Sequence, residues 1–267
     1  LLGVDVMTGH WEFTFGEEIF LENLRNFNGD FVAQNISLTE EAIFEGLEAV
    51  DDDNHFQKPY VVKTINGSRV AVIGQAFPYT PIANPQRLIP NLTFGIRDSE
   101  LQELINHIKN KEKPSLIVML SHNGVDVDKK MASKVSGIDI ILGGHTHDVL
   151  PKPVIVKNNS NSTLVINSGC NGKFISVLDL NVRGNSFSYK YKLLPVLSNQ
   201  IKPSKKMIML IDSLKKPHKD HLDQIIGKSS LDLYRRGNFN GSFDNLICDS
   251  LTHVLDTEIS LSPGFRW

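Results

Sequence analysis

Four of the nine histidines directly follow apolar runs that are typical of buried strands. Open α/β sheets place their ligands at the carboxyl ends of the strands, so these imidazoles are predicted to meet at one edge of a sheet. Neutral imidazole is the commonest metal ligand in proteins. The sequence therefore predicts a metal site built from His10 after Val-Asp-Val-Met7, His122 after Leu-Ile-Val-Met-Leu-Ser121, and His145 with His147 after Ile-Ile-Leu142.

The pair His145-Thr-His147 is the most specific of these signals. Alternate residues after a strand can point to the same side, so both rings can converge on one metal centre or on two adjacent ones. The preceding Gly143-Gly144 lets the backbone turn tightly beside the ions. Metallo-β-lactamase-type hydrolases follow such a pair with Asp-His, whereas Asp148 is followed here by Val149 and Leu150. A protease-like His-Glu-x-x-His motif is absent from the sequence.

The remaining histidines and the thiols receive structural interpretations. His55 follows an acidic run and is predicted to lie in a solvated loop. Cys170 follows a strand and fits a reactive thiol, but an incidental one is favoured. Trp11 fits a core aromatic and a pocket wall equally well. Surface positions on helices are predicted for His107, His218, His221 and His253.

The elements that must position the histidines alternate between short apolar strands and amphipathic helices. A helix is predicted at 98–112, where Leu101, Leu104, Ile105 and Ile108 share one face and Ser99 with Gln102 fits a capping box. A second helix is expected at 126–136. Near-continuous apolar strands covered by helices predict an α/β sheet buried on both faces, with later strands in a second, more antiparallel sheet. The strands are expected at 70–77, 115–120, 138–142, 163–167 and 175–182.

Composition excludes several classes of function. The 267 residues carry 28 Lys+Arg and 30 Asp+Glu, a net charge of −2, so no strong overall field recruits nucleic acid or an anionic membrane. No apolar run approaches the ~20 residues of a membrane span. The two cysteines make neither a disulfide framework nor a zinc ribbon.

The chain is predicted to contain three segments. Residues 1–197 form a catalytic domain, 198–225 a Lys-rich linking helix, and 226–267 the start of a second α/β domain. Both ends resemble cuts through structured protein, so we expect a fragment that is inactive alone, with missing motifs upstream of Leu1.

The histidine motifs resemble those of the 5′-nucleotidase-type metallophosphoesterase superfamily. Ser121-His122 and the run from Gly143 to His147 match its Ser-His and Gly-Gly-His-x-His motifs. Its first two motifs, Asp-x-His and Gly-Asp, are the ones expected upstream of Leu1. Its Gly-Asn-His-Glu motif aligns with Gly9-His10-Trp11-Glu12, which places His10 at an asparagine metal ligand and Trp11 at the catalytic histidine. The resemblance implies a two-sheet sandwich flanked by helices, followed by a linking helix and a nucleotidase-type C-terminal domain.

Three longer strings resemble the SoxB family of sulfate-releasing hydrolases within this superfamily. They are the run from Met7 to Gly16, the run from Arg235 to Asp244, and Ser262 to Trp267. This resemblance implies a periplasmic dimanganese hydrolase that releases sulfate from a cysteine S-thiosulfonate on the SoxYZ carrier protein. The alternatives are a 5′-nucleotidase or nucleotide-sugar phosphatase, and a binding module that has lost its metals.

The same resemblance assigns roles to individual residues. His10, His122, His145 and His147 become metal ligands, with Trp11 and Arg266 as the catalytic positions. Two divalent ions are expected, manganese by family and zinc as a competitor, because imidazole-rich sites bind zinc more tightly. Substrate binding is assigned to Arg235, Arg236 and Arg266, and orientation of the imidazoles to Asn123 and Asp148.

Overall fold

The computed structural model describes residues 2–184, 186–235 and 241–262. The chain divides into two compact units, Leu1–Leu197 and Ser198–Trp267. Among the described residues, no helix combines the length and apolar character that crossing a membrane requires. The first unit contains the sheet and all four histidines predicted as ligands.

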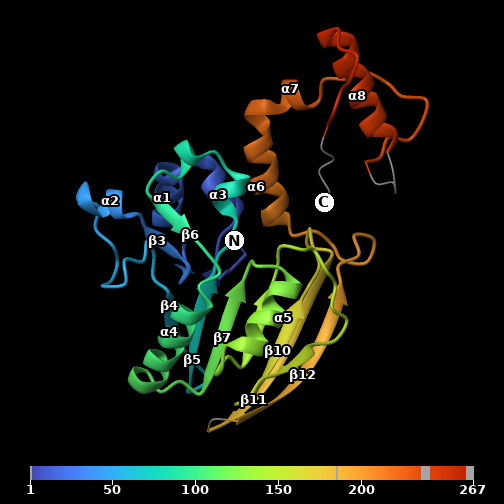
Figure 1. Cartoon of the computed structure of the whole chain (residues 1–267). Coiled ribbons are helices and arrows are strands. Elements are labelled where there is room, and N and C mark those ends of the chain that lie inside the picture. Colours follow the sequence, from blue (N-terminus) through green and yellow to red (C-terminus); the bar gives the residue numbers. More distant parts are fainter. Residues whose placement is uncertain (1, 185, 236–240, 263–267) are drawn as a thin grey trace. The chain divides into compact units, whose positions relative to one another are not determined.

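A six-stranded sheet in the order β4-β5-β7-β8-β10-β9 forms the centre of the first unit (Figure 1). Its four inner strands are parallel, and the two edge strands run antiparallel to their neighbours. The predicted mixed α/β class is confirmed. The strands are β4 (Tyr60–Ile65), β5 (Ser68–Gln75), β7 (Leu116–Ser121), β8 (Ile140–Gly143), β9 (Val154–Lys157) and β10 (Ser162–Asn167).

Two helices, α4 (Asp98–Lys111) and α5 (Val125–Lys134), cover one face of this sheet (Figure 1). Their apolar faces pack on the inner strands in a core that includes Ile105, Met119 and Ile141. The capping box predicted for Ser99 and Gln102 is wrong. Helix α4 begins at Asp98, so Ser99 lies inside its first turn, and the residue before the helix is Arg97 in a left-handed conformation. The Gln102 side chain instead accepts a hydrogen bond from the backbone N–H of Ser136.

A long hairpin of β11 (Phe174–Arg183) and β12 (Ser186–Pro195) covers the other face. Leu180, Val182 and Phe187 pack against Val70 and Leu116 of the sheet. Alternate residues of a strand point to opposite faces, so continuously apolar strands can bury both sides of the sheet. The second, antiparallel layer expected from the sequence is therefore present.

Short elements around the first strand make an aromatic core of their own. Phe13 stacks on Phe20 with ring centroids 4.7 Å apart, and Phe20 contacts Phe31 edge-on. This core fixes the segment that carries His10. The elements are β1 (Val6–Met7), η1 (Trp11–Phe15), α1 (Glu17–Asn26), β2 (Asp30–Phe31), β3 (Ile36–Leu38), α2 (Glu40–Phe44), α3 (Thr80–Ala83), η2 (Gln86–Leu88) and β6 (Leu92–Phe94).

The second unit is helical in the part that the structure describes. No residue of α6 is buried, so the apolar stripe predicted from Met207 to Leu214 has no core of its own there. The three-segment division of the chain stays a prediction. The elements are α6 (Lys205–Lys215), η3 (Lys216–His218), α7 (Lys219–Leu222) and α8 (Ser242–Leu255).

Candidate metal centre

Three of the four predicted ligands meet at one point. One ring nitrogen from each of His10, His122 and His145 lies within 4.8 Å of the other two. Nδ1 of His10 is 3.0 Å from Nε2 of His122. His10 follows β1, His122 follows β7 and His145 follows β8, so each ring comes from the carboxyl end of a different strand. The predicted convergence of these three side chains is present.

The loops that carry the histidines approach one another very closely. A Cβ atom at Gly144 would lie 3.3 Å from Nδ1 of His122, so a larger residue there would crowd that ring. His145 and His147 adopt positive φ angles of 75° and 60°, a conformation that costs non-glycine residues on the order of 1–3 kcal/mol. Such strain persists only where the surrounding structure holds it, and it is concentrated at functional sites.

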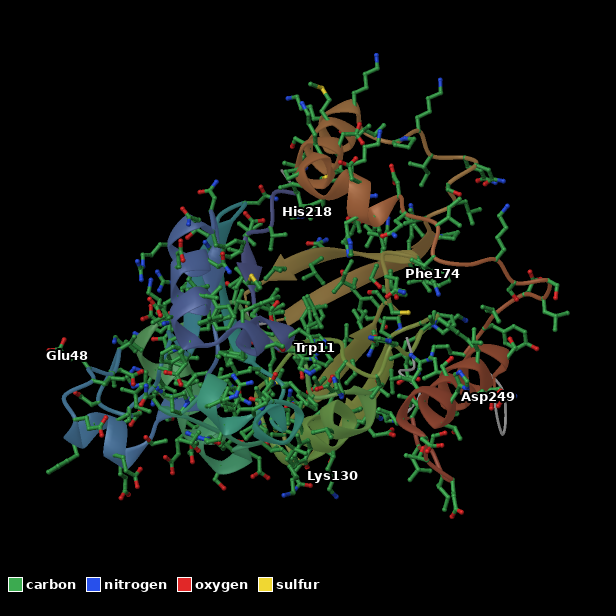
Figure 2. All side chains as sticks on the ribbon, turned by 90° about the horizontal axis from the view of Figure 1, so that it is seen from above. Trp11, Glu48, Lys130, Phe174, His218 and Asp249 are labelled. Carbon is green, nitrogen blue, oxygen red and sulfur yellow. The ribbon has the colours of Figure 1, made fainter. Side chains whose placement is uncertain are left out.

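Two aromatic rings fix the orientation of His10. Trp11 stacks on one side with centroids 4.7 Å apart, and Phe77 contacts the ring at 4.3 Å. Phe77 also stacks on His145 at 4.0 Å, so one buried ring supports two of the three imidazoles. Trp11 is 45% exposed and forms an outer wall of the centre, on η1 (Figure 2). Sequence reasoning missed Phe77, because its pattern places it in the predicted strand 70–77.

The environment of the rings keeps them neutral. Burial, reinforced by the charges that neighbouring histidines would carry, lowers the pKa of His10 to about 4 and that of His122 to about 3. The same causes lower the pKa of His145. All three rings therefore offer lone pairs at neutral pH. Three neutral imidazoles within this spacing fit one divalent transition-metal ion.

The fourth predicted ligand, His147, is exposed and stands outside this group of three. It is nevertheless close enough to act electrostatically, because its charge lowers the pKa of all three clustered rings. Among the described residues, no hydrogen bond joins the exposed Asp148 carboxylate to a histidine. Arg235 forms an ion pair of 3.0 Å with Asp244 in the second unit. Arg236 and Arg266 lie outside the described residues.

A buried carboxylate that the sequence analysis missed lies behind the centre. Asp128 of α5 is fully buried, and its Oδ1 accepts a hydrogen bond of 2.5 Å from the Ser121 hydroxyl. Asn123, predicted to orient an imidazole, instead donates from Nδ2 to the same oxygen at 3.4 Å. Burial raises the Asp128 pKa to about 6, although these two hydrogen bonds oppose the rise.

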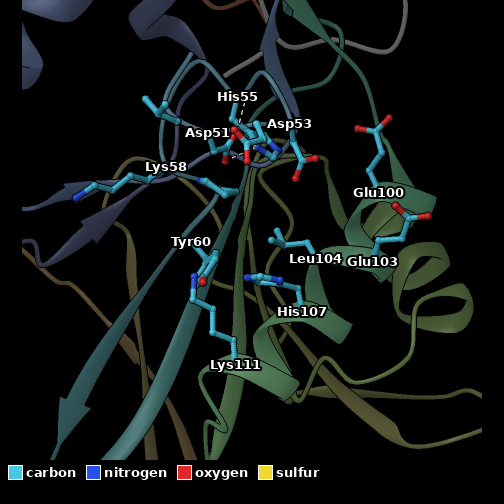
Figure 3. Close-up of a pocket in the computed structure, with 13 residues that line it drawn as sticks. Asp51, Asp53, His55, Lys58, Tyr60, Glu100, Glu103, Leu104, His107 and Lys111 are labelled. Carbon is cyan, nitrogen blue, oxygen red and sulfur yellow. Dashed lines mark hydrogen bonds and ion pairs between the residues drawn. The ribbon is translucent and has the colours of Figure 1, made fainter. Parts of the chain in front are cut away.

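A separate pocket of about 660 Å³ lies between the 50–60 loop and α4 (Figure 3). Its lining is rich in carboxylates, including Asp51, Asp53, Glu100 and Glu103. The prediction that His55 is solvated is wrong: this ring is buried, and its Nδ1 lies 2.8 Å from Asp51 Oδ2. The carboxylate run folds back on the ring and removes it from solvent. His107 is exposed on α4, as predicted.

Known proteins are similar to this chain in sequence and in structure over nearly its whole length. No protein-family model matches it. A 5′-nucleotidase-related protein of Glossina morsitans morsitans is 25% identical over 98% of this chain and 49% of its own length. The Thermus thermophilus sulfate thiohydrolase SoxB matches with a TM-score of 0.81 and 27% identity, covering 95% of this chain and 44% of that one. A 5′-nucleotidase precursor, also from Thermus thermophilus, matches with a TM-score of 0.80 and 24% identity, over 95% and 52%.

This chain thus spans about half the length of these relatives. Their fold is the same sheet flanked by helices. Together with the strand-end histidines, these likenesses support placing the chain in the 5′-nucleotidase-type metallophosphoesterase superfamily.

Proposed function

We propose that this chain carries the metal-binding half of a hydrolase that cleaves a tetrahedral, oxygen-rich group from its substrate. The observation that carries the proposal is the convergence of His10, His122 and His145, three neutral imidazoles from three strand ends. Divalent ions bound here would activate water near neutral pH and hold the oxygens of the group under attack. The chain's own part is to keep these rings unprotonated and correctly spaced.

Two divalent ions are proposed, with manganese as the resident metal and zinc as a competitor. The described residues fit one ion directly, because His10, His122 and His145 supply three nitrogen ligands. His147, exposed beside them, is the proposed ligand of the second ion. Its remaining ligands would come from the Asp-x-His and Gly-Asp motifs expected by resemblance.

For the substrate, we propose a cysteine S-thiosulfonate on the SoxYZ carrier, with release of sulfate in the periplasm. The support is Trp11, which stands where the resemblance puts the nucleotidase acid. An indole cannot protonate a leaving group. A persulfide is a better leaving group than a nucleoside alcohol and needs less help from an acid. The solved SoxB structure, 27% identical over 95% of this chain, agrees with this choice.

Arginines are proposed to bind the substrate. A planar guanidinium can form paired hydrogen bonds to sulfonate oxygens. By resemblance the group is Arg266, with Arg235 and Arg236 as helpers. Arg235 already pairs with Asp244, so it would act while held by that carboxylate.

A nucleotidase activity is the second candidate. It is favoured by the 5′-nucleotidase-related relative, which is 25% identical over 98% of this chain. On this alternative the substrate is a nucleoside monophosphate, and another group must supply the proton that Trp11 cannot.

The test is an assay of the intact protein on both substrates after reconstitution with manganese or zinc. We expect sulfate release from a thiosulfonate-loaded carrier and little phosphate release from adenosine monophosphate. The reverse result would establish the nucleotidase instead. His122→Ala is expected to lower either activity more than about a hundredfold, because even the partners of metal ligands contribute 10–100-fold. His107→Ala, on an exposed helix face, is the matched control. Full activity of His122→Ala would contradict both candidates.

A further inference from the structure

A row of residues crosses the sheet directly below the histidines. Four parallel strands end in Gln75, Ser121, Gly143 and Asn167, and each is the register partner of the next. Register partners in parallel strands point to the same face of the sheet. Three of the four are buried polar residues, and the exception is a glycine. A residue of helix α5, which is not part of the sheet, occupies the space that a side chain at position 143 would need.

Asp128 of α5 fills that space. A Cβ atom at Gly143 would clash with Asp128 Oδ2. That oxygen has no hydrogen-bond partner among the described residues, so it is held by packing against the glycine. The other oxygen, Oδ1, accepts hydrogen bonds from Ser121 and Asn123. These two residues flank His122.

The same region connects to the loop that carries His145. The backbone N–H of Val125 donates to Thr146 Oγ1 at 3.3 Å. A Cβ atom at Gly124 would lie only 2.7 Å from Thr146 Cγ2. The first turn of α5 therefore contacts both histidine loops, and Asp128 is its buried polar anchor.

We propose that Asp128 is a positioning residue that fixes the distance between the His122 and His145 rings. It does so by bonding both neighbours of His122 while packing against Gly143, two residues before His145. The carboxylate suits this role because it accepts hydrogen bonds without donating any. Ser121 can then donate its hydroxyl proton to Asp128 and accept from the Asn123 backbone N–H at 3.2 Å. This inference rests on the proposed metal centre.

The test uses cobalt(II) as the probe, because both its affinity and its visible absorption spectrum report on the ligand geometry. We expect Asp128→Ala to weaken cobalt binding about 10–100-fold, the range for residues that orient metal ligands, and to shift the spectrum. Asp128→Asn keeps an acceptor for Ser121 and should restore most of the affinity. The matched control is Asp126→Ala, which removes an exposed carboxylate from the same turn of α5.

Ser121→Ala makes the test independent of whether Asp128→Ala folds. It deletes one hydroxyl and should reproduce the spectral shift with about a tenfold weaker affinity. Wild-type affinity and spectrum in Ser121→Ala and in folded Asp128→Ala would overturn the positioning role. The proposed metal centre fails separately, if His122→Ala binds cobalt as tightly as the wild type.

Discussion

Two regions of the first unit contain a buried histidine, and they differ in what faces the ring. In the pocket beside α4, both carboxylate oxygens of Asp51 lie within 2.9 Å of His55 Nδ1. At the carboxyl end of the sheet, His10 faces His122 and His145, and no carboxylate of the described residues joins the group. A ring paired with a carboxylate already has its partner. Rings that have no carboxylate partner keep lone pairs available for a cation. Both kinds of ring are buried, so burial alone does not identify a metal ligand.

The largest expected consequence of this difference is the effect of acid on the metal-free protein. The folded state holds the pKa of His10 near 4 and that of His122 near 3, whereas the unfolded chain has 6.5. Below pH 6.5 the unfolded state therefore binds protons that the folded state does not. Stability is fully present above pH 6.5 and is lost as the pH falls toward 4 and below.

Asp128 opposes this loss, because its pKa of about 6 exceeds the unfolded value of 3.8. Its contribution is present below 3.8 and lost as the pH rises through 6. Two lowered histidine pKa values outweigh one raised carboxyl pKa, so the net effect of acidification is a loss of stability. Urea unfolding between pH 7.5 and 4 measures it. A free energy of unfolding that does not fall over this range would contradict the account of the strand-end rings.

The next expected effect separates the two regions by metal binding. His122→Ala removes one of three clustered ligands and should weaken zinc binding more than about a hundredfold. Even residues that only hydrogen-bond to a metal ligand contribute 10–100-fold to metal affinity. His55→Ala should leave the zinc affinity unchanged, because that ring is already bonded to Asp51. Calorimetric titration of metal-free protein gives both values. Equal losses of zinc affinity in the two variants would show that the strand-end histidines and His55 do not differ in metal binding.

His55→Ala is instead expected to affect stability. It removes the buried hydrogen bond between the ring and Asp51, which costs about 1–3 kcal/mol, while the backbone N–H of residue 55 still donates to Asp51 Oδ1. Denaturant unfolding at pH 7.5 checks this value. His107→Ala, in the same pocket but exposed, should change the free energy of unfolding by less than about 0.5 kcal/mol. If His55→Ala left the free energy of unfolding unchanged, the His55 ring would not contribute to stability.

The smallest expected effect concerns Trp11, the exposed aromatic residue beside His10. Trp11→Ala removes the stacking partner on one side of His10, an interaction of about 0.5–1.5 kcal/mol. Zinc affinity should therefore fall by about tenfold at most, while Phe77 still supports the ring. A loss as large as that of His122→Ala would indicate that Trp11 does far more than orient His10.

The strand-end histidines could be predicted from sequence because their signal is local. An apolar run followed by a histidine fixes both the strand and the position of the ring, and parallel strands then bring such positions together. This reasoning holds for His122 and His145, which follow neighbouring parallel strands of the six-stranded sheet. His10 also joins the group, but it follows β1, which pairs with β2 in a separate two-stranded sheet. The same pattern left His147 open to a second, adjacent metal centre, and the structure has this residue outside the group of three.

The supporting residues could not be predicted for the opposite reason. Asp128 lies on a predicted helix in a polar stretch, and only tertiary packing brings its carboxylate behind Ser121. Phe77 falls in a predicted strand that ends two residues earlier in the structure. His55 was misjudged because an acidic run usually indicates a solvated loop, whereas here Asp51 bonds the ring and allows its burial. Long-range partners determine the environments of Asp128 and Phe77, and a folded-back loop determines that of His55.

The most direct test of the central claim is a crystal structure of the protein soaked with zinc, with the ion located by anomalous scattering. The account predicts a peak about 2.0–2.1 Å from one ring nitrogen each of His10, His122 and His145. A second peak beside His147 would support the two-ion proposal. An ion bound only among Asp51, Asp53 and Glu100 in the other pocket, with the three strand-end rings unligated, would contradict it.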